Sequence, residues 1–124
     1  MTAGNAGKRF TFPKTRRLTR PSEFERVKQT GRVERGRLMV LSVLETNDAN
    51  RFRAGFITSR ALGPTVKRNR VRRRLREIVR KHQAAIADGT WIVTIARHWA
   101  VNATYRELEG EWLRLAERAS ILGA

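Results

Sequence analysis

Hydrophobic and polar residues alternate along this chain with two different periods. Short runs with a period of two predict β-strands, and spacings of three to four residues predict α-helices. The pattern predicts helices over residues 21–29, 65–86 and from about 104 onward, and strands over 32–35, 38–45, 51–59 and 91–96. The resulting order α-β-β-β-α-β-α predicts an α/β fold with one sheet and helices packed on it.

Polar and turn-forming residues mark the ends of these elements. Thr65 is the expected N-cap of the long helix, and either Asn102 or Thr104 opens the last one. Residues 1–20 show no periodicity and hold six cations without an acid, punctuated by glycine and proline. We therefore expect a basic, flexible N-terminal arm over 1–20 that orders on contact with a partner, followed by one domain over 21–124.

The long helix has two faces of opposite character. On a helical wheel the apolar side chains cluster within one sector, which predicts a stripe buried against the sheet. Its members are Val71, Leu75, Ile78, Val79 and Ile86. A ridge of hydrogen-bond donors lies on the opposite side, formed by Asn69, Arg73, Arg76 and Arg80, with Arg70 and Arg72 flanking it.

The composition of the whole chain indicates what kind of partner that ridge would bind. The 124 residues carry 27 Lys and Arg against 11 Asp and Glu, a formal net charge of +16, and 22 of the 27 cations are Arg. Such an excess favours a polyanionic partner, and the planar guanidinium suits phosphates and base edges. The absence of Cys excludes disulfides, a thiolate nucleophile and a cysteine-ligated zinc site. No apolar run approaches the roughly 20 residues of a membrane span, and no export signal is visible, so we expect a cytoplasmic protein.

The placement of charge in the long helix is unfavourable for the helix alone. Residues 67–82 hold nine cations and one acid, with Arg repeated at i,i+4, and each such pair destabilises a helix by roughly 0.2–0.5 kcal/mol. Lys67, Arg68 and Arg70 also crowd the N-terminal end, where the helix dipole disfavours cations. A merely solvated face would carry balancing acids, which are absent here. We infer that phosphates of a nucleic acid supply the missing anions, although charge alone does not say which nucleic acid.

At this helix the sequence resembles a known family. Arg68-Asn69-Arg70, followed by the run Arg72 to Glu77, resembles the "RNR" signature helix of the bacterial ribonuclease P protein subunit. The likeness covers most of the chain. Further matching segments are Arg17-Leu18, Glu23-Phe24 with Val27 and Gly31, Arg53-Ala54-Gly55-Phe56, Ser59-Arg60 and Ile92 to Arg97.

The resemblance implies a fold and a function that the residues by themselves do not show. The implied fold is a two-layer α/β sandwich like the second domain of ribosomal protein S5, with a left-handed βαβ crossover. The implied function is that of a protein subunit that binds the catalytic RNA of ribonuclease P and the 5′ leader of precursor tRNA. Magnesium ions held mainly by the RNA would perform the cleavage, and the protein alone would be inactive. No membrane and no small-molecule cofactor is implied.

The resemblance also assigns residues to two surfaces. Arg68, Asn69, Arg70, Arg73 and Arg76 would contact the catalytic RNA, and we add the neighbouring Arg72 and Arg80. Phe24, Lys28, Val40, Ser42 and Arg60 would lie in or beside a leader-binding cleft between the first helix and the sheet. Relatives often have aromatic residues where this chain has Lys28 and Ser42, and a second cation where it has Ala61, so leader binding here would rest less on stacking and more on charge.

No set of residues suggests a catalytic or metal site in the protein. His82 falls within the apolar stripe and is expected to be a packed histidine, and His98 is expected in a loop. Glu77 is expected to pair with a neighbouring Arg rather than to bind metal. Among the aromatic residues, Trp91, Trp112, Tyr105 and Phe56 are expected in the core and Trp99 at the surface, whereas Phe24 could be core or cleft wall, and Phe10 and Phe12 could stack on bases or fold back on the sheet.

Three other functions are compatible with a small basic chain. A structural ribosomal protein is the main alternative, because it would be equally small and rich in Arg. A DNA-binding module would insert the long helix into a major groove, but the flanking strands make this a poor fit. A self-sufficient nuclease would need the acid–base pair or metal cluster that we do not find. The class of catalytic RNA, the oligomeric state and any preferred leader sequence do not follow from the sequence.

Overall fold

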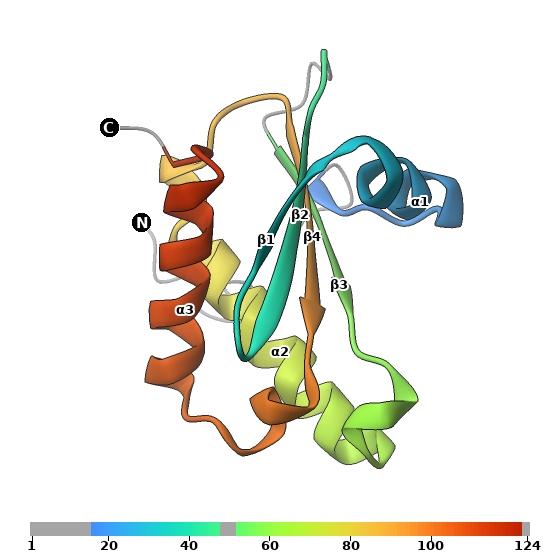
Figure 1. Cartoon of the computed structure of the whole chain (residues 1–124), viewed down its shortest axis with the longest axis vertical. Coiled ribbons are helices and arrows are strands. Elements are labelled where there is room, and N and C mark those ends of the chain that lie inside the picture. The colour runs from blue at the N-terminus through green and yellow to red at the C-terminus, as the bar shows by residue number, and fades with distance from the viewer. Residues whose placement is uncertain (1–15, 48–51, 123–124) are drawn as a thin grey trace, which may run out of the picture.

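One four-stranded sheet organises the molecule (Figure 1). The computed structural model describes residues 16–47 and 52–122. Strands β1 (Arg32–Arg35), β2 (Met39–Glu45), β3 (Phe52–Ile57) and β4 (Thr90–Ala96) lie in the order β1-β2-β4-β3. The β1–β2 and β2–β4 pairs are antiparallel, whereas β3 and β4 are parallel. The three α-helices are α1 (Pro21–Thr30), α2 (Thr65–Lys81) and α3 (Tyr105–Arg118), and short 3₁₀ turns are η3 (Arg60–Leu62), η4 (Gln83–Ala85) and η5 (His98–Asn102).

This order confirms the expected α/β sandwich, with α2 connecting the parallel strands β3 and β4. Helices α2 and α3 cover one face of the sheet, and α1 packs on the other (Figure 1). No helix among the described residues combines the length and the apolar character needed to span a bilayer.

The ends of the helices differ from the sequence-based expectation at two places. Pro64 occupies the N-cap of α2 and Thr65 is its first residue, so the expected Thr65 cap is wrong. The helix also ends at Lys81 rather than at residue 86. Tertiary contacts account for this early end, because Ile86 forms an isolated bridge with Leu122 and its segment must leave the helix axis to reach it. At α3, Thr104 rather than Asn102 is the cap, in a reciprocal capping box with Glu107.

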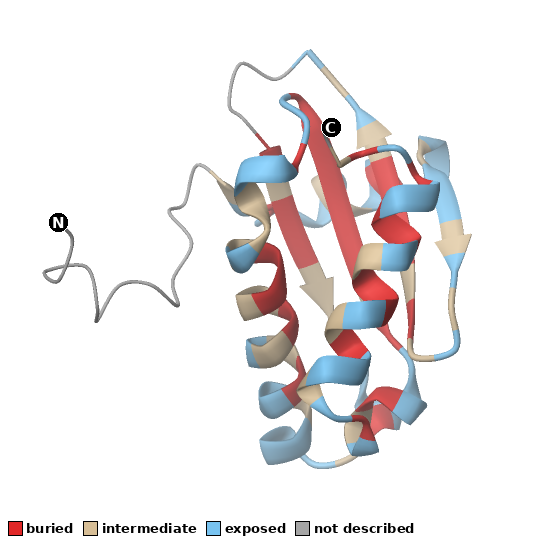
Figure 2. Ribbon diagram, turned by 90° about the vertical axis from the view of Figure 1, so that its left-hand side faces the viewer, coloured by how far each residue is buried: buried red, intermediate tan, exposed pale blue. Residues whose placement is uncertain are grey.

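The main hydrophobic core lies between the sheet and the helices α2 and α3. Alternate residues of β2 point into it, as the period of two predicts, and so does the apolar stripe of α2 (Figure 2). Met39, Leu41 and Val43 from β2 meet Val71, Leu75, Ile78 and Val79 from α2 and Leu108, Trp112 and Leu115 from α3. The predicted stripe is therefore confirmed, including Ile86 beyond the end of the helix.

A smaller apolar cluster lies on the opposite face of the sheet, under α1. Val27 of α1 is fully buried against Trp91 and Val93 of β4, and Leu18 joins them from the chain before α1. The guanidinium of Arg26 stands over the ring of Trp91, 5.3 Å from its centroid. This cluster fixes α1 over one end of that face.

The segment just before α1 also belongs to the folded domain. Arg17 forms a parallel bridge with Ala54, and the backbone N–H of Leu18 donates to the Ala54 carbonyl at 3.0 Å. At least residues 16–20 of the expected flexible arm are thus part of the structure, along the free edge of β3. The remainder of that arm, including Phe10 and Phe12, lies outside the described residues.

Candidate nucleic-acid interface

The face of α2 that points away from the core carries the predicted ridge. Asn69, Arg70 and Arg73 are exposed, whereas Arg68, Arg72, Arg76 and Arg80 are half-buried. Asn69, Arg72, Arg73 and Arg76 line a shallow depression of about 220 Å³. The tertiary structure therefore presents these side chains together on one outward surface, as the helical wheel predicts.

Two arginines on this face of α2, Arg68 and Arg72, are held by neutral groups. Arg72 donates to Asn69 Oδ1 at 3.0 Å and to Thr58 Oγ1, and Arg68 donates to Thr65 Oγ1 at 3.1 Å. Across the described part of the chain, none of Arg68, Arg70, Arg72, Arg73, Arg74 and Arg76 forms an ion pair. The guanidinium groups of Arg68 and Arg72 are therefore oriented by hydrogen bonds, but no carboxylate among the described residues neutralises them, so they can still bind an external anion.

The expected ion-pair role of Glu77 is not found among the described contacts. Lys81, in the last turn of α2, forms an ion pair with Glu109 of α3 at 3.0 Å. The first turn of α2 contains no acid and no side-chain cap. Its free backbone N–H groups and the helix dipole therefore add to the positive field at this end of the ridge.

A second group of cations forms where α2 meets the edge of β3. Arg17, Arg72 and Arg76 line a cavity of about 130 Å³ together with Leu18, Phe24 and residues 54–56 of β3. Burial, followed by repulsion from Arg17 and Arg72, lowers the pKa of Arg76. Positive charge is therefore concentrated around this small cavity.

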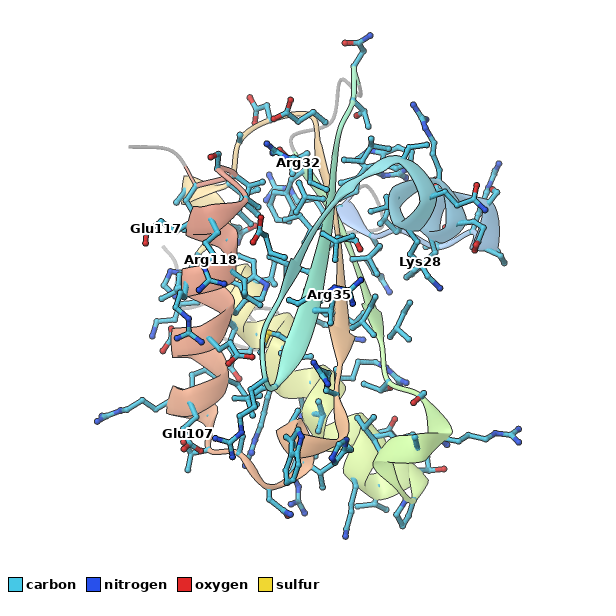
Figure 3. The ribbon with its side chains drawn as sticks, in the orientation of Figure 1. Lys28, Arg32, Arg35, Glu107, Glu117 and Arg118 are labelled. Atoms are coloured by element: carbon cyan, nitrogen blue, oxygen red, sulfur yellow. The ribbon has the colours of Figure 1, made fainter. Side chains whose placement is uncertain are left out.

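The opposite face of the sheet is covered by α1 at one end and open at the other. Arg35, Val40, Ile95 and Ile57 are directly paired across the four strands, so their side chains point to the same face. The three apolar members of this row are half-buried, and Arg35 is exposed. Figure 3 shows Arg35 on β1 and Lys28 on α1, which place cations around the open end.

Phe24 forms the boundary between the covered and the open parts of this face. Its ring lies directly on the backbone of Gly55, where a Cβ atom would come within 2.5 Å of Phe24 Cε2. The same ring lines the cavity with Arg17, Arg72 and Arg76. Glycine at position 55 thus lets the ring of Phe24 pack closely on the sheet.

Comparison with known proteins shows the family to which the chain belongs. The family described as ribonuclease P matches residues 12–120 of the chain. The chain belongs to the ribonuclease P protein family. It is 42% identical over 109 residues to the ribonuclease P protein component of Acidothermus cellulolyticus, which covers 86% of this chain and 90% of the relative. Identity to the component from Symbiobacterium thermophilum is 38% over 109 residues, covering 88% and 95%.

Solved structures of ribonuclease P proteins share the fold. The Staphylococcus aureus ribonuclease P protein superposes with a TM-score of 0.81 at 25% identity, covering 87% of this chain and 98% of that one. Membership makes the chain the protein subunit of the ribonuclease P endoribonuclease, a ribonucleoprotein, and an RNA is therefore its partner. The alternative of a structural ribosomal protein is not favoured.

The residues expected in the leader-binding cleft of this ribonuclease P protein differ in how far they are buried. Phe24 and Val40 are half-buried, and Lys28 and Arg60 are exposed. Ser42 has only 3% of its surface exposed and lies beneath, in the floor. The sequence analysis did not assign Arg17 or Arg35 to either surface. The basic run before residue 21 signalled Arg17, but only the strand pairing brings either residue to these surfaces.

The histidines of the chain have structural surroundings. His82 is half-buried, its Nε2 lies 2.8 Å from Glu109 Oε2, and its ring stacks on Trp112 at 6.4 Å between centroids. This confirms the expected packed histidine. Burial is as expected for Trp91 and Trp112, whereas Phe56 and Tyr105 pack at the margin of the core. In the portion of the chain that the structure covers, no group of three or more His, Asp or Glu side chains could hold a metal ion.

Glu23 ties α1 to the sheet beside the cleft. Its Oε1 accepts from the backbone N–H groups of Thr19 and Arg20 at 2.9 and 3.0 Å, and its Oε2 accepts from Arg53 at 2.8 Å. Burial alone would raise the pKa of Glu23, but these hydrogen bonds and the charge of Arg53 lower it below the ordinary value. The carboxylate therefore stabilises the folded state in its charged form.

Replacing Glu23 by Gln should make stability less dependent on pH. Because the folded pKa lies below the unfolded one, the contribution of Glu23 is present above about pH 4.5 and is lost as the pH falls through the folded pKa. We expect the Tm of Glu23→Gln to be below wild type at neutral pH and the two to converge in acid, measured by circular dichroism. Glu25→Gln on the exposed side of α1 is the matched control, and an equal effect there would contradict the role of Glu23.

Proposed function

We propose that this chain binds the catalytic RNA of ribonuclease P through α2 and the 5′ leader of precursor tRNA over the open end of the sheet, and so assists magnesium-dependent removal of the leader. The observation that carries the proposal is the outward face of α2, where Arg70, Arg73 and Arg76 have no carboxylate partner among the described residues. Family membership supplies the RNA.

The ridge suits a folded RNA because it combines charge with fixed geometry. Arg72 is oriented by Asn69 and Thr58, so less side-chain entropy is lost when it binds a phosphate. Asn69 is exposed and can form hydrogen bonds to bases that are splayed from a helix. Arg17 extends the surface from α2 to the edge of β3.

The open end of the sheet suits a single strand. Val40, Ile95 and Ile57 offer a half-buried apolar floor for bases, with the ring of Phe24 at one side. The cations Lys28, Arg35 and Arg60 are exposed around it and would contact leader phosphates. Because Ser42 is buried, Phe24 is the side chain on which bases would stack in this cleft. The surrounding cations would then contribute more to the affinity than stacking does.

We assign the magnesium ions to the RNA. The described residues include no cluster of three potential ligands, and Mg²⁺ is commonly bound through phosphates and waters with one or two carboxylates. The part of this chain would be to neutralise phosphates near the reacting bond and to hold the leader. Both effects would lower the magnesium concentration at which cleavage occurs.

Reconstitution tests the proposal. The purified chain is added to ribonuclease P RNA and precursor tRNA at a magnesium concentration too low for the RNA alone, and release of the leader is followed. We expect the protein to restore cleavage and to be inactive without the RNA. Unchanged cleavage with the protein, or cleavage by the protein alone, would refute it.

A precursor whose leader is a single nucleotide separates the two surfaces. If the cleft binds the leader, the protein should tighten binding of the long-leader precursor and have little effect on the short one. If both precursors gain equally, the chain acts through the catalytic RNA only and the leader assignment fails.

A further inference from the structure

A further groove opens beside α3 in the described structure. It has a volume of about 620 Å³ and runs between the β1–β2 turn, η5 and the N-terminal half of α3. Its cations are Arg37, Arg106 and Arg114, its carboxylates are Glu107 and Glu111, and its aromatic residue is Trp99. Neither the ridge nor the open end of the sheet contributes to it.

Trp99 is a large aromatic side chain left at the surface. It is 51% exposed, whereas Trp91 and Trp112 are buried. The ring of His98 lies 4.4 Å from it between centroids, and the guanidinium of Arg37 stands 5.7 Å from its centroid. These contacts hold the indole in place while half of its surface stays open, which is the arrangement of a stacking platform.

The carboxylates of the groove are already occupied by the protein. Glu111 is buried, its Oε2 accepts from the backbone N–H groups of Leu38 and Met39 at 2.6 and 3.1 Å, and its Oε1 accepts from Arg114 at 3.0 Å. Glu107 caps the start of α3 through Thr104. Arg37 and Arg106 have no carboxylate partner among the described residues, so the groove keeps a positive character.

Two residues of α3 are poor choices for the helix but good ones for an open, positive groove. Arg106 lies in the first turn, where the helix dipole disfavours a cation. Gly110 lies in the helix interior, where glycine is destabilising, and a Cβ there would meet nothing within 4 Å. No steric contact of the fold explains this glycine, whereas a groove that must admit a ligand would.

We propose that this groove is a further binding site for single-stranded RNA, in which a base stacks on Trp99 and the adjoining phosphates contact Arg37 and Arg106. Its positive charge and its open aromatic ring complement a nucleotide chain better than a protein surface. The inference rests on the proposed function only in taking RNA as the partner, and it assigns that partner a surface separate from α2 and from the cleft. Stacking platforms of this kind tolerate any base, so we expect little sequence preference.

The emission of Trp99 tests the proposal, because a base stacked on the exposed indole should quench it, and comparison with Trp99→Phe separates it from the emission of the buried Trp91 and Trp112. The full chain is titrated with an eight-nucleotide oligouridylate at low salt, with tryptophan fluorescence reporting the groove and anisotropy of a labelled oligonucleotide reporting all binding. We expect saturable quenching that Trp99→Phe removes. We expect Arg106→Ala to weaken the quenching transition at least about threefold, whereas Arg118→Ala, at the other end of α3 (Figure 3), leaves it unchanged.

Gly110 supplies a variant that separates binding from folding. Gly110→Gln fills the groove and improves the helix, so its Tm should rise while quenching is lost, and Gly110→Ala should raise the Tm and retain most of the quenching. Anisotropy that rises without any change in Trp99 emission would overturn the groove and leave the proposed function intact. A blue shift of Trp99 with protein concentration alone would also overturn it, by indicating that a second copy covers the ring.

Discussion

Replacing Arg70 and Arg73 together by Ala is expected to weaken binding of the catalytic RNA by roughly 1–3 kcal/mol, or about five- to 150-fold. Both side chains are exposed on the ridge of α2, and neither has a carboxylate partner among the described residues. Their loss should also reduce the slope of log K against log salt by roughly two, about one for each phosphate contact. Filter binding at several salt concentrations measures both quantities.

The paired Lys variants give the control for this experiment. Arg70→Lys with Arg73→Lys keeps both charges but removes the planar fork, so the salt slope should stay near wild type while affinity falls partly. The Ala pair relieves like-charge repulsion in α2 and the Lys pair leaves the charge unchanged, so neither pair should unfold the protein. A slope unchanged in the Ala pair would show that these residues do not contact phosphates.

Trp112→Ala should have the largest effect on stability, about 3–5 kcal/mol of the roughly 5–15 kcal/mol typical of a domain. Trp112 is fully buried at the meeting point of α2, α3 and the sheet, and its Nε1 donates to Thr94 Oγ1 at 3.4 Å. The substitution leaves a cavity and removes the ring on which His82 stacks. Urea denaturation followed by circular dichroism measures the loss.

Two other tryptophan variants serve as comparisons for the stability loss of Trp112→Ala. Trp112→Phe keeps most of the volume and should be less destabilising than Ala. Trp99→Ala removes a half-exposed ring and should stay within about 0.5 kcal/mol of wild type. If Trp112→Ala were as mild as Trp99→Ala, the core would not be organised around this residue.

The sequence was sufficient for those features that depend on neighbours along the chain. The stripe from Val71 to Ile86 and the ridge from Asn69 to Arg80 follow from the helical period, and both were predicted correctly. The strands and their order along the chain followed from the alternation of hydrophobic and polar residues and from turn residues. The excess of Arg pointed to nucleic acid because a polyanion is the simplest counterpart for unbalanced positive charge.

Sequence reasoning was weaker where contacts between distant segments decide the structure. Nothing near Glu111 along the chain indicates that its carboxylate is buried against the backbone of Leu38 and Met39, some 70 residues away. Helix α2 ends at Lys81 although its apolar period continues, because the following segment pairs with Leu122 instead. Local propensity is outweighed in these places by long-range hydrogen bonds and burial.

The amino-acid sequence by itself determined the elements, the buried stripe and the basic character of the chain, since period and charge are properties of nearby residues. Only the tertiary structure decided which cations from different elements of the chain share a surface. Strand pairing brings Arg17 to Arg72 and Arg76, and Arg35 to the row of Val40. It also gathers Arg37, Trp99 and Arg106 in one groove. Register and helix packing fix such distances, and neither is encoded in spacing along the chain.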